Sequence, residues 1–400
     1  MNERPLDGVR VLALEQMQAL PYATQLLARL GADVVKVEPP GGESGRSSVP
    51  FMRDPDGRIV GATFLRNNLD KRTIAVDLKS PEGRELVMRL APRFDVFAEN
   101  SKAGSMRKLG LGYDDLAAVH PTVIYASVSG FGNTVPSPYA TWPAYATIVE
   151  AMSGIYEFKR EGDDRPRVNP VGALGDISAA LFCAIGILAA LRHRDRTGRG
   201  QYVDIAMLDA VVAMTDIVTN FTSMGVHSTG TAVVLDAFRA DDGWFIIQVG
   251  REPQFHRLAE VVGQPEWVGD PRFASREGWV AHTEDVIRPA IESWAQGRTK
   301  VAAAAAMSDA GLASGPCLTP AEVLTDEHLG ARNMLVAIER TDDEPGPIIT
   351  PGNPVRLTDV PDAPNTRIPW LGEHTDEVLR TELALDDAEL ARLRGAGVIV

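Results

Sequence analysis

A single carboxylate, Asp176, stands directly in front of one of the most apolar stretches of the chain. Residues Ile177–Leu191 have helical length and are apolar nearly all round, which predicts a buried helix. Aspartate is a preferred N-cap, so we expect Asp176 to cap this helix. The N–H groups at a helix start can bind an anion, which leaves two interpretations of Asp176: a cap alone, or a catalytic nucleophile.

A second group with chemical potential is basic and lies between positions 66 and 108. Its members flank predicted strands, so they would surround one crevice if those segments met at one edge of a sheet. Charge-assisted contacts to phosphate groups need such an arrangement, whereas the alternative is solvated surface charge. The set consists of Lys71, Arg72, Lys79, Lys102, Arg107 and Lys108.

Other catalytic and metal-binding signals are weak. The seven histidines show neither an H-E-x-x-H motif nor metal-ligand spacing, and two cysteines, Cys183 and Cys317, supply no disulfide framework. The chain has no P-loop, no G-x-S-x-G elbow and no G-x-G-x-x-G after its first predicted strand. If the chain is an enzyme, a cofactor-free reaction at a carboxylate is the interpretation that remains.

The predicted elements alternate between strand and helix over the first 200 residues, which indicates a doubly wound α/β domain. Strands at Val9–Leu14 and Ala32–Glu38 flank a helix at Tyr22–Leu30, and this βαβ unit implies a parallel pair. Open parallel sheets place their ligands at the carboxyl ends of the strands. Further strands are predicted at 73–78, 94–99, 122–129 and 202–205.

Length and charge limit the class of protein. Four hundred residues predict two domains, and a net charge of -14 argues against a nucleic-acid partner. The polar N-terminus and the shortness of the apolar run favour a cytoplasmic protein without a membrane partner. We predict a large α/β domain over 1–205, a linker helix over 206–225, a small α+β domain over 226–335 and an irregular linker over 336–370.

Blocks of sequence along nearly the whole chain fit one known pattern. They include Leu6–Leu12, Ala23–Glu38, Asp77–Arg84, Gly175-Asp176, Thr197–Asp204 and Leu371–Thr375. In this order they resemble the family III CoA-transferases, the group that includes formyl-CoA transferase, carnitine CoA-transferase and α-methylacyl-CoA racemase. A single block is weakly specific, whereas this many in order are strongly so.

The resemblance implies a Rossmann-like large domain built from both chain ends, with 371–400 returning to it, and a smaller domain. In this family two ring-like subunits interlock into a homodimer. The implied activity moves coenzyme A from an acyl-CoA thioester to a carboxylic acid through a covalent aspartyl intermediate. Coenzyme A is then a substrate, and neither a permanently bound cofactor nor a metal is expected.

The resemblance also assigns roles to particular residues. It makes Asp176 the catalytic residue. The implied contacts to coenzyme A are Gln18, Ala19, Val76, Lys79, Asn100 and Lys108, with Arg107 as a neighbouring candidate.

Two departures from the family pattern bear on the reaction. Where the racemase branch has Gly-His-Asp, this chain reads Ala144-Tyr145-Ala146, and racemisation needs an acid/base pair that is missing there. The segment Met224–Gly230 has only two glycines where some transferases carry a glycine-rich loop. Transfer is therefore favoured; racemisation with Tyr145 in a new role and non-catalytic CoA binding, with Asp176 only a cap, remain alternatives.

Overall fold

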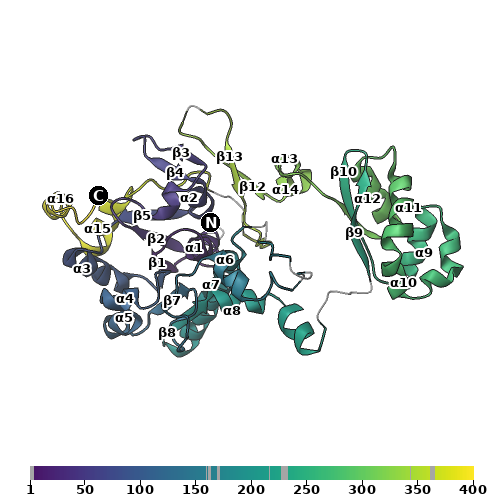
Figure 1. Cartoon of the computed structure of the whole chain (residues 1–400). Helices are drawn as coiled ribbons and strands as arrows, with labels where there is room; N and C mark the ends of the chain where they lie inside the picture. The colour runs from purple at the N-terminus through teal and green to yellow at the C-terminus, as the bar shows by residue number, and fades with distance from the viewer. Residues whose placement is uncertain are drawn as a thin grey trace. The chain divides into compact units, whose positions relative to one another are not determined.

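The computed structural model describes residues 4–158, 160, 164–168, 172–215, 217–226, 233–342, 344–360 and 365–400. The chain forms two compact units (Figure 1). Unit 1 comprises Met1–His227 together with His328–Val400, and unit 2 comprises Ser228–Glu327. Both ends of the chain thus belong to unit 1.

A six-stranded parallel sheet forms the centre of unit 1, in the order β5-β2-β1-β6-β7-β8. All five neighbouring pairs are parallel, as the alternation of strands and helices predicts. The strands are β1 (Arg10–Leu14), β2 (Asp33–Glu38), β5 (Lys71–Ala75), β6 (Val96–Glu99), β7 (Ile124–Ser129) and β8 (Gln201–Ala206).

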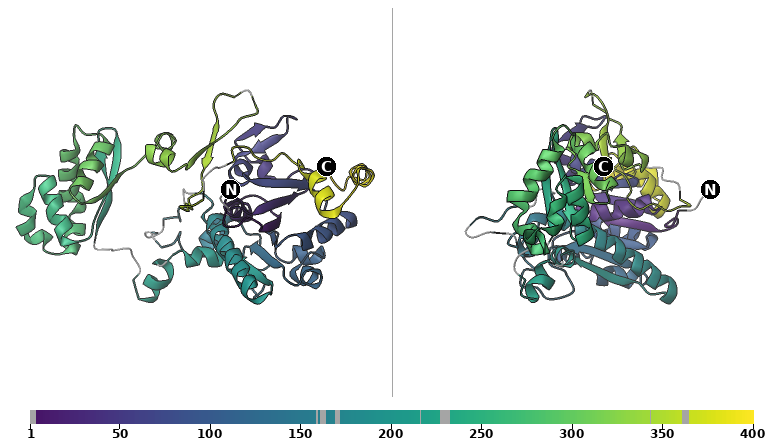
Figure 2. Two further views of the ribbon diagram at one scale, coloured as in Figure 1. Left: turned by 180° about the vertical axis from the view of Figure 1, so that it is seen from behind. Right: turned by 90° about the vertical axis from the view of Figure 1, so that its right-hand side faces the viewer.

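Both faces of this sheet are buried under helices, because successive side chains of a strand point to opposite faces. In β1, Val11 and Ala13 join the core under α1 (Ala19–Arg29), α7 (Leu174–Thr197) and α8 (Met207–Ala213). Leu12 and Leu14 join the other core. That core is covered by α3 (Pro81–Leu90), α5 (Tyr113–Val119), α15 (Thr375–Leu383) and α16 (Asp387–Gly395). The last two helices bring the C-terminal segment beside the sheet (Figure 2).

Local sequence accounts for several helix ends. The Ser80 hydroxyl accepts a hydrogen bond from the Gly83 N–H and Pro81 opens α3, which is the predicted capping arrangement. Helix α1 ends before Gly31, whose φ of +115° suits glycine and lets the chain turn directly into β2.

Unit 2 contains a three-stranded antiparallel sheet in the order β11-β10-β9. Its strands are β9 (Val234–Ala240), β10 (Gly243–Val249) and β11 (Ala313–Pro316). Phe245, Ile247 and Val249 alternate into a core shared with α9 (Glu252–Val261), α11 (Arg288–Ala295) and α12 (Lys300–Asp309).

Two predictions about connecting segments are wrong. The supposed linker over 336–370 contains the hairpin β12 (Leu335–Ile338) and β13 (Ile348–Pro351), and Val336 and Ile338 are buried in a small core. The helix predicted over 206–225 stops at Ala213; α8 packs into unit 1, and a separate π-helical turn, Ile217–Phe221, follows. The proline, glycine and acidic residues of 336–370 hid the short strand alternation from sequence analysis. Apolar residues on both sides of the break suggested one continuous helix over 206–225.

Helix α7 is also less buried than predicted. It has an exposed stripe at Leu181, Ile185 and Leu188, with Ile185 60% exposed. Among described helices it alone is long and apolar enough to cross a membrane, but half of its most apolar window is buried inside the protein, and core helices pass the same test.

Candidate active site

A pocket of about 360 Å³ lies at the carboxyl ends of β1, β6 and β7, where an open parallel sheet places its ligands. Gln18 and Ala19 reach it from the start of α1, Asn100 from the end of β6, and Asp176 from the first turn of α7. The structure therefore brings together four of the predicted site residues. Residues 129–132, at the end of β7 and directly after it, also line the pocket.

Asp176 is not the N-cap that the sequence predicts. Helix α7 begins at Leu174 with Ala173 as its cap residue, so Asp176 is the third helical residue. The helix starts earlier because Gly172, at φ +82°, turns the chain, and its carbonyl accepts a hydrogen bond from the Leu174 N–H at 2.7 Å. A carboxylate in the first turn still lies at the positive end of the helix dipole.

The cap function belongs instead to Glu150, a fully buried residue of α6 (Ala146–Met152). Its Oε1 accepts a hydrogen bond from the Gly175 N–H at 3.0 Å, and its Oε2 accepts one from the Tyr156 hydroxyl at 2.5 Å. A Cβ on Gly175 would lie 2.7 Å from Val149 Cγ2. Only glycine thus allows α6 to pack directly against the start of α7.

Asp176 has a perturbed acidity. Burial, and second the negative charge of Glu150, raise the pKa of Asp176 to about 6. The carboxylate is therefore ionised at neutral pH, yet it is more basic than an ordinary aspartate. Such perturbed groups in a pocket are typical of functional sites, and a more basic carboxylate is the better nucleophile.

The turn that joins β1 to α1 forms another wall of the pocket through Gln16, Met17 and Gln18. Asn100 Oδ1 accepts a hydrogen bond from the Gln16 N–H, and Asn100 Nδ2 donates one to the Gln16 carbonyl, both at 2.9 Å. Asn100 is therefore a clamp on this turn, a role that its position in the sequence did not indicate. Met17 has a φ of +60°, a left-handed conformation that costs a residue with a Cβ roughly 1–2 kcal/mol.

Two members of the predicted basic set do not belong to the crevice. Lys71 is buried, and its Nζ lies 2.6 Å from Glu15 Oε1. Arg72 pairs with Asp33 at 2.6 Å. Both residues begin β5 rather than follow it, so their charges serve the fold of unit 1.

The remaining predicted contacts lie outside the pocket lining. Val76 is buried and bridges to Ile399, while Lys79 is exposed after β5. Arg107 and Lys108 are exposed in α4 (Ser105–Lys108), after β6. Strands β5 and β6 stand three positions apart in the sheet, so their carboxyl ends lie roughly 14 Å apart at the usual spacing of strands.

Sequence reasoning missed two residues of this region, Met17 and Glu150. Lys102, a member of the predicted basic set, does line the pocket, while Met17 lines it without any signal in the sequence. Glu150 could have been found, because it is a lone acid within the apolar sequence Ile148–Met152. Tyr145, which stands where the racemase branch has its histidine, lines the pocket and is 72% exposed. Of the segment Met224–Gly230, which stands where some transferases carry a glycine-rich loop, residues 227–230 lie outside the described residues.

Comparison with known proteins gives a consistent result. A sequence model of CoA-transferase family III matches residues 6–375. The chain is 36% identical to succinyl-CoA:mesaconate CoA-transferase of Haloarcula hispanica, covering 94% of this chain and 95% of that protein. It is also 36% identical to succinyl-CoA–D-citramalate CoA-transferase of Chloroflexus aurantiacus, covering 99% and 98%.

Solved structures agree with the sequence comparisons. The crystal structure of a CAIB/BAIF family protein from Brucella suis superimposes with a TM-score of 0.82 at 33% identity, covering 95% of this chain and 99% of that one. The α/β fold with its six-stranded parallel sheet is thus the fold of this family. The chain belongs to CoA-transferase family III and is an enzyme that moves coenzyme A between an acyl-CoA and a carboxylate.

Proposed function

We propose that Asp176 is the nucleophile of this transfer and carries a covalent aspartyl intermediate. The observation that supports the proposal is its place: a carboxylate of raised pKa, in the first turn of a helix, lining a pocket at the carboxyl edge of the sheet. The start of α1, at Gln18 and Ala19, opens on the same pocket. The start of α1 therefore offers N–H groups to the negative charge that develops during acyl transfer, whereas the Leu174 and Gly175 N–H groups of α7 already have acceptors within the protein.

The proposed reaction proceeds through exchanges of acyl groups. The Asp176 carboxylate attacks the thioester carbonyl, and the CoA thiolate leaves, which gives a mixed anhydride. The thiolate attacks the aspartyl carbonyl, so the donor acid is released and an aspartyl-CoA thioester forms. The acceptor carboxylate then attacks this thioester and expels the thiolate. Finally the thiolate attacks the acceptor's carbonyl, which yields the new acyl-CoA and restores Asp176.

We assign the binding of coenzyme A to side chains near the carboxyl edge of the parallel sheet. Lys79, Arg107 and Lys108 are exposed cations suited to its phosphates, and Lys102 lies within the pocket. Gln18, Ala19, Val76 and Asn100 stay proposed contacts, with Asn100 able to act mainly through the turn that it clamps.

The relatives suggest the class of substrate. Both named relatives transfer from succinyl-CoA, to mesaconate or to D-citramalate, and these acceptors are dicarboxylates. We propose that this chain likewise uses an acyl-CoA of a dicarboxylic acid and a dicarboxylate acceptor. Transfer from succinyl-CoA to each acceptor, followed by chromatography of the CoA esters, tests the assignment.

The decisive variant is Asp176→Ala. It is expected to abolish transfer while CoA still binds, and mass spectrometry of the wild-type protein mixed with donor alone is expected to find the adduct on the peptide that contains Asp176. Asp195→Ala is the matched control, since Asp195 is an exposed residue near the other end of the same helix. Retained turnover in Asp176→Ala would refute the nucleophile; so would an adduct on another residue.

We further propose that the protein is a cytoplasmic homodimer, with the interlocked arrangement that the family resemblance implies. The exposed apolar side chains of α7, Leu181, Ile185 and Leu188, are suited to burial against a second copy. Sedimentation analysis is expected to give twice the mass of one chain, and a monomer at micromolar concentration would contradict the proposal.

A further inference from the structure

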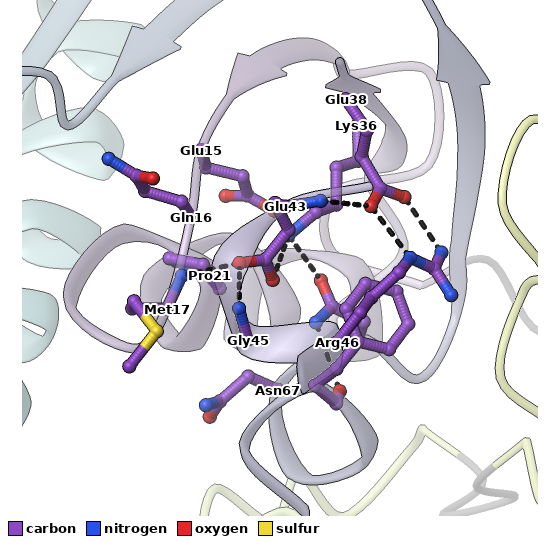
Figure 3. A network of polar contacts seen from close by, with 12 residues as sticks. Glu15, Gln16, Met17, Pro21, Lys36, Glu38, Glu43, Gly45, Arg46 and Asn67 are labelled. Carbon is purple, nitrogen blue, oxygen red and sulfur yellow. Dashed lines mark hydrogen bonds and ion pairs between the residues drawn. The ribbon is translucent and has the colours of Figure 1, made fainter. Parts of the chain in front are cut away.

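Six ionisable side chains form a buried network behind the pocket, and none of them takes part in the proposed chemistry; Figure 3 labels all of them except Lys71. All are at most 6% exposed. Three carboxylates balance three cations, so the cluster has no net charge. Its members are Glu15, Glu38, Glu43, Lys36, Arg46 and Lys71.

The network consists of paired groups with short contacts. Arg46 binds Glu38 through two nitrogens, each at 2.7 Å, and Lys36 Nζ lies 3.2 Å from Glu43 Oε1. Strand β2 supplies Lys36 and Glu38, while Glu43 caps the short 3-10 helix Ser44–Ser47 that follows and Arg46 lies within it. Such pairs keep every buried charge compensated.

Glu43 is the member of the network that touches the pocket wall. Its Oε2 accepts hydrogen bonds from the Met17 N–H at 3.0 Å and from the Gly45 N–H at 2.5 Å (Figure 3). Met17 is the left-handed residue of the Gln16–Gln18 turn, and Asn100 holds that turn at Gln16. A left-handed methionine persists only where its surroundings hold it, and Glu43 holds the backbone at that residue.

We propose that Glu43 is a positioning residue of the transfer reaction: its carboxylate fixes Met17 in the left-handed conformation and so holds the Gln16–Gln18 wall against Asp176. The proposal rests on the proposed function for its kinetic consequence. Although burial opposes ionisation, the Lys36 ammonium and the two N–H groups hold the pKa of Glu43 below its ordinary value. The acceptor therefore keeps its full charge throughout the neutral range.

The test compares two buried pairs of the same network. Lys36→Met with Glu43→Met removes the pair that holds Met17. Glu38→Gln with Arg46→Met removes a pair that does not contact Met17 and keeps an acceptor for the Glu43 N–H, which lies 3.2 Å from Glu38 Oε2. Both double variants leave the network neutral. We expect kcat to fall about 10²-fold in the first, the loss typical of a displaced reacting group, and less than about 3-fold in the second.

Rescue by glycine separates positioning from simple loss of stability. Met17→Gly, added to the first double variant, is expected to recover at least about 10-fold in kcat, because glycine adopts the left-handed conformation without cost. In the wild-type background Met17→Gly is expected to give no increase in kcat, because Glu43 already holds the turn there. Equal losses in the two double variants, or no recovery with glycine, would overturn the proposal.

Amide hydrogen exchange measures the hydrogen bond between the Met17 N–H and Glu43 independently of enzyme activity. Exchange at Met17 is expected to accelerate in the Glu43 variant and to stay slow in the Glu38 variant. Glu43→Ala, which also removes the acceptor of the Met17 N–H, gives the same comparison if the first pair does not fold. Unchanged exchange at Met17 would overturn the proposal. If instead the wild-type protein transfers no CoA, the proposed function fails, while the exchange result still decides whether Glu43 holds the turn.

Discussion

The charge of Glu150 is expected to set part of the acidity of Asp176, and Glu150→Gln measures that part. The variant keeps an oxygen for the Gly175 N–H, so the packing of α6 on α7 is preserved while the charge is lost. The pKa of Asp176 is about 6 against an ordinary 3.8, and burial is the larger cause. Glu150 therefore accounts for less than half of the difference, up to about one pH unit or about 1.4 kcal/mol.

The assay is kcat/KM for acyl-CoA as a function of pH. The acid limb of the wild-type enzyme should have its midpoint near pH 6, because the nucleophile must be ionised. In Glu150→Gln the midpoint should fall toward pH 5. At pH 5 the ionised fraction of Asp176 then rises from about one tenth to about half, whereas at pH 8 both enzymes are fully ionised. The advantage of the variant should therefore appear only in acid.

Tyr156→Phe is the matched control, because it removes the hydroxyl that donates to Glu150 and leaves the carboxylate in place. Its midpoint should stay near that of the wild-type enzyme. An acid limb that does not move in Glu150→Gln would refute an electrostatic role for Glu150. A wild-type limb near pH 4 would refute the larger claim that burial raises the pKa of Asp176.

Three further outcomes follow from the same geometry. Because the pKa of Asp176 is raised in the folded protein, its ionisation lowers the free energy of unfolding above about pH 6 and has no effect below about pH 4. Asp176→Asn should therefore increase the free energy of unfolding at pH 8 by up to about 3 kcal/mol and change it little at pH 4, measured by denaturant unfolding. A variant that is less stable at pH 8 would contradict this reasoning. Gly175→Ala should lose activity and roughly 1–3 kcal/mol of stability, since its Cβ would lie 2.7 Å from Val149 Cγ2; calorimetry and turnover measure both, and a fully active variant would show that α6 can give way. Incubation of acyl-CoA in D₂O should introduce no deuterium at Cα, and exchange that is lost in Tyr145→Phe would instead support racemisation.

Some features depend only on neighbours along the chain, and these were predictable. The alternation in β1, with Val11 and Leu12 on opposite faces, follows from the strand period, and Ser80 begins a helix because its hydroxyl reaches an N–H three residues on. The sequence blocks that resemble the family similarly indicated Asp176 as the candidate catalytic residue. Its exact place in the helix was missed, because a glycine turn two residues before the helix decides where the helix starts.

Tertiary structure alone decided how these parts meet. Strand order puts the ends of β1 and β6 side by side, so Asn100 clamps Gln16 across 84 positions of sequence. The sequence predicts Lys71 to be an exposed cation, whereas the structure buries it beside Glu15, which lies 56 positions away in the sequence. The physical reason is that helix and strand periods are local, whereas the burial of a charge depends on a partner that the sequence does not place beside it.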